Sequence, residues 1–271
     1  MTTEQPQARP QRPRPVMRKI EVAGVERITP HMVRVSLTGA GLNDFALPGP
    51  GGHVRLFLPG EGGSLPEVDA EGRLPEGTPR PLSRVYTPRR FDAAAKRLDV
   101  DIVLHEGTDG PGSTWARAAA NGNKQMMTGP SGRPYTPDPE ADWYVIAGDH
   151  AGLPAVATIV ESLPAGKRAD VYVEVPEAAD QVELLSAATL NVKWVHGGHE
   201  APGEALAAAM KTTELPEGNG RVFVACEAGA LREIKRNLLI DRGLNRDHVY
   251  THGYWARGEP NHPDHDLAPE I

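Results

Sequence analysis

The sequence predicts two domains, a small antiparallel β-barrel of about six strands followed by an α/β domain with a parallel sheet. The first observation is length, because 271 residues suit two domains of ordinary size. The second is the pattern up to about residue 128, where apolar residues come in short β-branched runs that alternate with polar ones, as in half-buried strands. The third is the change after residue 139, where apolar strands alternate with helical patterns, which is typical of a parallel sheet with crossover helices.

The barrel strands are expected within residues 16–128, with clear runs at 32–37, 53–58, 84–86, 98–104 and 124–127. Together they bring the count to about six, the number of a small antiparallel barrel. Residues 59–81 are dense in Gly, Pro and acidic residues without a periodic pattern. This segment is expected to be a long surface excursion.

The α/β domain is expected to contain strands at 143–147, 171–175, 192–195 and 222–225, a last strand ending near 258, and helices at 153–163, 204–210 and 231–239. Four prolines between residues 129 and 141 mark a linker. The sequence therefore predicts domains at 16–138 and 139–258, with tails at 1–15 and 259–271.

Composition excludes several functions. The formal net charge is -7, so no overall field attracts nucleic acid. Cys226 is the only cysteine, which excludes an intramolecular disulfide and a multi-cysteine zinc site. No apolar stretch reaches the roughly 18 residues that span a bilayer, and the N-terminus has no signal-peptide pattern. We expect a cytoplasmic protein that is not membrane-embedded and has no metal site, with His262 and His265 in a solvated tail.

The first motif is Arg84-Val85-Tyr86-Thr87, on a predicted strand and followed by Arg89 and Arg90. Alternate side chains of a strand share a face, so Arg84 and Tyr86 project together. A guanidinium can clamp a pyrophosphate and a tyrosine can pack on a flat ligand. An exposed strand with solvated Arg and Tyr remains an alternative.

The second motif begins with Asp101, Val103 and His105 on a strand, which leads into a glycine-rich loop and a helix carrying Gly112, Ser113 and Trp115. Amides at a helix N-terminus attract anions, and glycine lets a phosphate approach the backbone. The motif indicates a second phosphate-binding element, although a plain capped helix would have the same sequence.

Two further motifs follow strands of the α/β domain. Gly148-Asp149 stands at the carboxyl end of the first strand, where ligands of parallel sheets bind, although its glycines do not spell a dinucleotide fingerprint. Tyr254-Trp255 closes the last strand in a chain with few aromatic residues. For Gly148-Asp149 the alternative is a tight turn. For Tyr254-Trp255 the alternative is a pair of aromatic residues that packs the last strand.

These elements, in this order, resemble the siderophore-interacting protein family of flavin-dependent ferric-siderophore reductases, within the ferredoxin reductase-like superfamily. The resemblance covers residues 16–258 and rests on the motifs above together with Gly129-Pro130-Ser131-Gly132, Leu153-Pro154-Ala155, Glu227-Ala228 and Gly253. It implies an FAD-binding barrel and a nicotinamide-binding α/β domain, with the flavin between them.

The resemblance also implies roles for single residues. FAD would be bound by Arg84 at the pyrophosphate, Val85 and Tyr86 along the cofactor, Thr87 at the isoalloxazine ring, Asp101, Val103 and His105 at the adenosine, Gly112 and Ser113 at the phosphates, Trp115 close by, and Tyr254 and Trp255 at the flavin. Gly148 and Asp149 would face the nicotinamide nucleotide. The chain departs from the family at His150, Cys226, Ala256 and Ser131, which affects substrate charge preference and nicotinamide handling.

The implied activity passes electrons from NADH or NADPH through FAD to the Fe(III) of a ferric siderophore, releasing Fe(II). No acid–base residue is expected to be catalytic. Arg89, Arg90 and Arg257 are candidates to attract an anionic siderophore, and solvated arginines are the alternative. Two alternatives remain open: an FAD electron-transfer module that is driven by ferredoxin or only binds its ligands, and a flavin oxidoreductase with a non-iron acceptor. Four acids in residues 174–183 favour NADH over NADPH.

Overall fold

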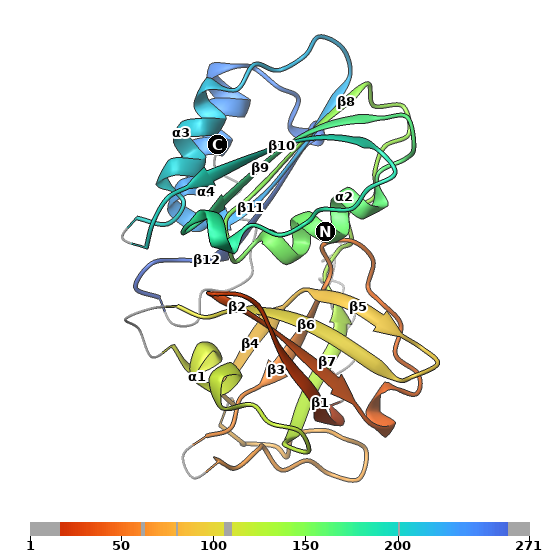
Figure 1. Cartoon of the computed structure of the whole chain (residues 1–271). Coiled ribbons are helices and arrows are strands. Elements are labelled where there is room, and N and C mark those ends of the chain that lie inside the picture. Colours follow the sequence, from red (N-terminus) through yellow and green to blue (C-terminus); the bar gives the residue numbers. More distant parts are fainter. Residues whose placement is uncertain (1–16, 61–62, 80, 106–109, 200, 260–271) are drawn as a thin grey trace, which may run out of the picture.

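The computed structural model describes residues 17–60, 63–79, 81–105, 110–199 and 201–259 (Figure 1). The predicted tails, 1–15 and 259–271, lie outside this range except for Glu259. The described chain forms two sheets, one of seven strands and one of five. This arrangement confirms the predicted fold class, a β domain followed by a parallel α/β domain, while the domain boundary near residue 138 stays a prediction.

The first sheet is antiparallel, with the order β4-β3-β7-β1-β2-β6-β5. Its strands are β1 (Arg18–Thr29), β2 (Met32–Thr38), β3 (His53–Phe57), β4 (Ser83–Tyr86), β5 (Pro88–Asp92), β6 (Arg97–Val103) and β7 (Lys124–Ser131). Two features differ from the prediction. There are seven strands instead of about six, because β5 has the sequence Pro-Arg-Arg-Phe-Asp without an apolar run. The hydrogen-bonded sheet is also open, with β4 and β5 as its edges.

The core of this domain comes from alternating strand residues. Val35, Leu37, Leu56 and Leu98 are completely buried in one cluster, as the β-branched and apolar alternation predicted. The two edge strands β4 and β5 follow each other in the chain, with Thr87 between them. The chain itself therefore connects the two edges, and the motif around Arg84 stands at this corner.

The second sheet is parallel, with the order β10-β9-β8-β11-β12. Its strands are β8 (Trp143–Gly148), β9 (Arg168–Val175), β10 (Thr189–His196), β11 (Gly220–Glu227) and β12 (Val249–Trp255). The helices are α2 (Leu153–Ser162), α3 (Glu204–Thr212) and α4 (Ala228–Arg236), and short helical turns lie at Ala40–Leu42, Ala178–Asp180, Asn237–Asp241 and Arg246–His248.

The helices cover both faces of this sheet. Residues of α2 pack with Ile146 in one cluster, and residues of α3 and α4 pack with Val145 in another. Adjacent residues of β8 thus face opposite layers, and Figure 1 shows α3 and α4 together on one side. Among the described residues no helix is long and apolar enough to cross a membrane.

The two domains are packed together through several contacts. Tyr135, from the predicted linker, is buried with its ring centroid 5.5 Å from that of Phe223 and 5.2 Å from that of Tyr250. A short helix, α1 (Pro111–Ala118), follows β6 and fills the barrel core with Trp115 and Ala116. At the junction of the two domains, β6, the start of α1 and the carboxyl ends of β8, β9 and β12 line neighbouring cavities.

Candidate functional site

Two neighbouring cavities lie at the junction of the domains. The larger, of about 510 Å³, is formed by β4, β6, the start of α1 and the end of β12. Among its lining residues are the predicted site residues Arg84, Val85, Tyr86, Asp101, Val103, His105, Gly112, Ser113, Tyr254, Trp255 and Arg257. Residues from three separate predicted motifs therefore meet around one cavity.

The strand β4 supplies the wall of this cavity. Arg84, half-buried, donates a hydrogen bond from Nη1 to the carbonyl oxygen of Ser83 at 2.8 Å. Burial lowers the pKa of the Arg84 guanidinium and raises the pKa of the Tyr86 hydroxyl. Thr87 is buried, and its Oγ1 lies 3.2 Å from Oη of Tyr254. The corner between β4 and β5 is thereby tied to the last strand of the other domain.

The start of α1, with Gly110, Gly112 and Ser113, lines the larger cavity. Its N-cap, Gly110, has no side-chain cap. Ser113 fixes this helix to the end of β6, because its Oγ donates to the carbonyl oxygen of Val103 at 3.1 Å and accepts from the amide of His105 at 3.2 Å. A Cβ on Gly112 would overlap the Tyr86 hydroxyl. The glycine leaves a bare backbone beside Arg84, a cradle that suits a phosphate group.

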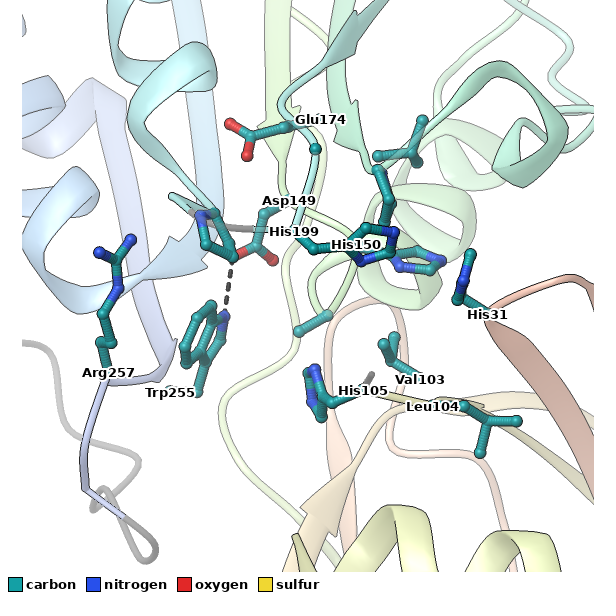
Figure 2. A pocket seen from close by; sticks show the side chains of 15 residues that line it. His31, Val103, Leu104, His105, Asp149, His150, Glu174, His199, Trp255 and Arg257 are labelled. Atoms are coloured by element: carbon teal, nitrogen blue, oxygen red, sulfur yellow. Dashed lines mark hydrogen bonds between the residues drawn. The ribbon is translucent and has the colours of Figure 1, made fainter. Parts of the chain in front are cut away.

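The smaller cavity, of about 220 Å³, lies at the carboxyl ends of β8 and β9 (Figure 2). It shares Val103, His105, Ala151, Trp255 and Arg257 with the larger one. Asp149 and Glu174 line it, as do four histidines, His31, His105, His150 and His199. Sequence reasoning missed His31 and His199 as site residues, and only their convergence in space reveals them.

Asp149 is the centre of a buried hydrogen-bond network. One carboxylate oxygen accepts from the amide of Gly152 at 2.9 Å. The other accepts from the amide of Glu227 and from Nε1 of Trp255, each at 2.8 Å. Figure 2 shows the bond from Trp255. Burial raises the pKa of Asp149 to about 6, and burial lowers the pKa of His150 to about 4. The network holds Trp255 between the two cavities.

Carboxylates of the chain itself satisfy amides at the starts of three helices of the α/β domain. Asp149 does so at α2 through Gly152. Glu174, at the end of β9, accepts at 2.6 Å from the amides of Gly203 and Leu206 at the start of α3. Glu227 accepts from two amides at the start of α4. At α1, in the other domain, no carboxylate of the described residues, which leave out 106–109, caps the first amides.

Several predicted residues lie away from both cavities. Trp115 belongs to the barrel core, and Gly148 is enclosed because a Cβ there would lie 2.7 Å from Val156. Arg89 forms an ion pair with Glu161 of α2 across the domain junction, with the nearest nitrogen and oxygen 2.5 Å apart. Arg90 is exposed on β5. The structure does not bring these four residues to the larger cavity.

Residues 174–183, the acidic segment from which a preference for NADH was predicted, have some of their carboxylates buried. Glu174 and Asp180 are buried and hydrogen-bonded within the protein, whereas Glu177 and Glu183 are exposed. Only Glu177 and Glu183, instead of all four acids of this segment, are therefore accessible to a nucleotide from solution. The preference for NADH stays a prediction, on a weaker basis than the sequence suggested.

Comparison with known proteins matches both halves of the chain. The model of the siderophore-interacting FAD-binding domain matches residues 21–134, and that of the siderophore-interacting protein matches residues 141–258. The ferric vibriobactin reductase ViuB of Vibrio cholerae is 30% identical over 249 residues, covering 88% of this chain and 89% of that protein.

Two solved structures resemble the whole described fold. A siderophore utilization protein from T. fusca is 38% identical, with a TM-score of 0.79, and the match covers 90% of this chain and 94% of that one. The siderophore-interacting protein SipS from Aeromonas hydrophila is 28% identical, with a TM-score of 0.77, over 92% and 95% of the two chains.

Proposed function

We propose that this protein is an FAD-dependent reductase of ferric siderophores. The chain belongs to the siderophore-interacting protein family and carries that family's FAD-binding domain. Electrons would come from NADH or NADPH, and Fe(II) would be released. The observation that carries this proposal is the larger cavity, where Arg84, the open start of α1 and Trp255 meet.

The residues around this cavity fit FAD. Arg84 and the amides at the start of α1 offer positive charge and donors to its pyrophosphate. Gly112 keeps the backbone accessible there, since any side chain would meet Tyr86. Tyr254 and Trp255 offer aromatic surfaces to the ring. When bound, FAD would supply the conversion between the two-electron chemistry of a nicotinamide and the one-electron reduction of ferric iron.

The chain itself would orient the reactants, exclude water and attract the chelate. The buried network around Asp149 fixes Trp255 between the cavities, which suits positioning more than proton transfer. Arg257 lines both cavities, is half exposed and lies 3.9 Å from Glu204. We infer that Arg257, instead of the ion-paired Arg89 or the distant Arg90, meets an anionic ferric siderophore.

The mode of nicotinamide binding is constrained by the three occupied helix starts. A dinucleotide pyrophosphate commonly binds amides at a helix N-terminus, yet Asp149, Glu174 and Glu227 already occupy these positions. We therefore expect weak, mainly side-chain recognition of NADH or NADPH. The same observation favours a second candidate, an FAD module that receives electrons from a ferredoxin.

One experiment separates these functions. The FAD-loaded protein is mixed anaerobically with NADH, NADPH or reduced ferredoxin, and flavin bleaching is followed; ferric siderophores are then added with a ferrous trap. Bleaching by a nicotinamide followed by ferrous trapping supports the proposal. Bleaching by ferredoxin alone supports the second candidate, and bleaching without iron reduction indicates a non-iron acceptor.

A matched pair of variants tests the substrate residue. In protein saturated with FAD, Arg257→Ala should raise the KM for an anionic ferric siderophore severalfold. Arg90→Ala removes the same charge from a position that lines neither cavity and serves as the control. Equal KM values for both variants would refute a role for Arg257.

A further inference from the structure

The last strand of the parallel sheet ends in a β-bulge. Between β11 and β12, Cys226 pairs with Gly253 but Glu227 pairs with Trp255, so Tyr254 is one extra residue in β12. Successive residues of a regular strand face opposite sides, and a bulge re-aims the side chains next to it. Tyr254 and Trp255 both line the larger cavity as a result. The bulge also brings the chain after Trp255 beside Glu227.

Glu227 joins this part of the chain to the start of α4. One carboxylate oxygen, Oε2, accepts hydrogen bonds from the amide of Gly229 at 2.5 Å and from the amide of Ala230 at 2.9 Å. The other oxygen, Oε1, accepts from the amide of Arg257 at 3.2 Å. The carboxylate therefore divides its oxygens between a helix start and the backbone that carries Arg257.

Residues 255–259 border the larger cavity along their whole length. The segment begins at Trp255, whose indole nitrogen donates to Asp149 at 2.8 Å. It ends in a turn that is closed by a backbone hydrogen bond of 3.1 Å. Between these two points, the amide of Arg257 donates to Glu227. The direction in which the Arg257 side chain leaves the backbone therefore depends on this bond.

The guanidinium of Arg257 is held less tightly than its backbone. The side chain is 53% exposed, and Nη2 lies 3.9 Å from Oε1 of Glu204, whose side chain is 74% exposed. An ion pair between exposed side chains contributes little free energy. The guanidinium can therefore exchange Glu204 for an anionic ligand, provided that the backbone presents it to the cavity.

We propose that Glu227 is a positioning residue, which holds the backbone of Arg257 so that the guanidinium meets an anionic ferric siderophore. This inference rests on the proposed function, in which Arg257 contacts that substrate. Glu227 is not among the described residues that line either cavity, so it acts through Arg257. Its negative charge by itself would repel an anion. Loss of positioning should therefore weaken binding of an anion, whereas loss of the charge alone should strengthen it.

Two variants remove the bond to Arg257 and keep a cap on α4. In Glu227→Gln the side chain has one acceptor oxygen, which we expect to stay with the two amides of α4, and its NH2 group cannot accept from Arg257. In Glu227→Asp the shorter side chain still caps the helix, because Asp is a preferred N-cap residue, but it no longer reaches Arg257. Glu233→Gln removes the same charge from an exposed position on α4 outside both sets of lining residues, and it is the matched control.

The test measures binding of a ferric tris-catecholate, a trianion, to the oxidised, FAD-saturated protein by quenching of tryptophan fluorescence. In both Glu227 variants the Kd should rise about threefold to tenfold, less than for a buried charged hydrogen bond because Arg257 is partly exposed. It should keep its wild-type value in Glu233→Gln, and the Kd for a neutral ferric tris-hydroxamate should not change. In an Arg257→Ala background, Glu227→Gln should have no further effect, since the two residues act as one unit.

The opposite results would overturn the positioning role. These are a Kd for the trianion that falls or stays unchanged in the Glu227 variants, an equal loss for the neutral complex, a further loss in the Arg257→Ala background, or no binding to the wild-type protein. Thermal unfolding identifies a variant with a fold defect, and the other Glu227 variant then decides the matter.

Failure of this role and failure of the proposed function give different results. Binding of the trianion that depends on Glu227, without ferric reduction by any donor, would support the positioning role and refute the reductase. Ferric reduction with Kd values that do not depend on Glu227 would support the reductase and overturn the positioning role.

Discussion

Replacing Gly112 by Ala tests the phosphate cradle at the start of α1. The added Cβ would overlap the Tyr86 hydroxyl and lie 3.6 Å from Cγ of Arg84. Because nonbonded heavy atoms settle at about 3.5 Å, Tyr86 or the first turn of α1 must move by about 1 Å. A shift of the helix turn separates the helix amides from Arg84, the two groups expected to hold the FAD pyrophosphate, and a shift of Tyr86 displaces a side chain expected to pack along the cofactor.

The expected loss follows from the hydrogen bonds involved. Weakening one bond to a charged phosphate costs about 1.5–3 kcal/mol, so the Kd for FAD should rise roughly tenfold to a hundredfold. The fold should suffer less, since Ala is up to about 1 kcal/mol better than Gly inside a helix. Titration of the apoprotein with FAD, followed by flavin fluorescence, measures the Kd.

Gly110→Ala provides the control, because a Cβ on Gly110 has no atom within 4 Å although the residue lines the same cavity. It should bind FAD like the wild-type protein. If the two variants have the same Kd, or if Gly112→Ala loses stability and keeps its affinity, the cradle at Gly112 does not hold the cofactor.

Three other predictions concern buried groups. Arg84→Ala should raise the Kd for FAD tenfold to a hundredfold, since a charged partner worth about 1.5–3 kcal/mol is removed; an unchanged Kd with an intact fold would make Arg84 a surface residue. Asp149→Asn has one acceptor oxygen for three N–H donors, so urea unfolding should show a loss of about 1–3 kcal/mol, and unchanged stability would contradict the network. Cys226 is buried and its thiol pKa is raised, so iodoacetamide at pH 8 should label it only after unfolding; equal native labelling would argue against this burial.

Local patterns were sufficient to predict the fold class. Apolar alternation marked β2, β3 and β6, and the change to strands separated by helical patterns marked the parallel sheet. The strand β5 was not predicted because its residues Pro88, Arg89 and Arg90 form no apolar pattern. It is held as an edge strand by its partner β6, and a one-sided edge strand needs no alternating pattern.

The sequence predicted the parts of the candidate site that lie in short continuous motifs. It did not predict the contacts between residues that are far apart in the chain. Arg84, Tyr86 and Gly112 belong to short segments whose chemistry can be inferred in isolation. The bond from Trp255 to Asp149 joins residues 106 positions apart, and His31 meets Asp180 across 149 positions. Such pairs depend on how the two domains dock, which neither composition nor periodicity encodes.

The four helix starts explain how one chain can separate its ligands. A helix N-terminus has unpaired amides and a positive dipole end, so any anion can occupy it. At α2, α3 and α4 the chain provides its own carboxylates, Asp149, Glu174 and Glu227. At α1 the described part of the chain, which leaves out residues 106–109, provides a glycine and no carboxylate. The internal carboxylates Asp149 and Glu174 also line the smaller cavity, which disfavours phosphates there. The same carboxylates that complete the α/β domain therefore direct phosphate binding to α1 and Arg84.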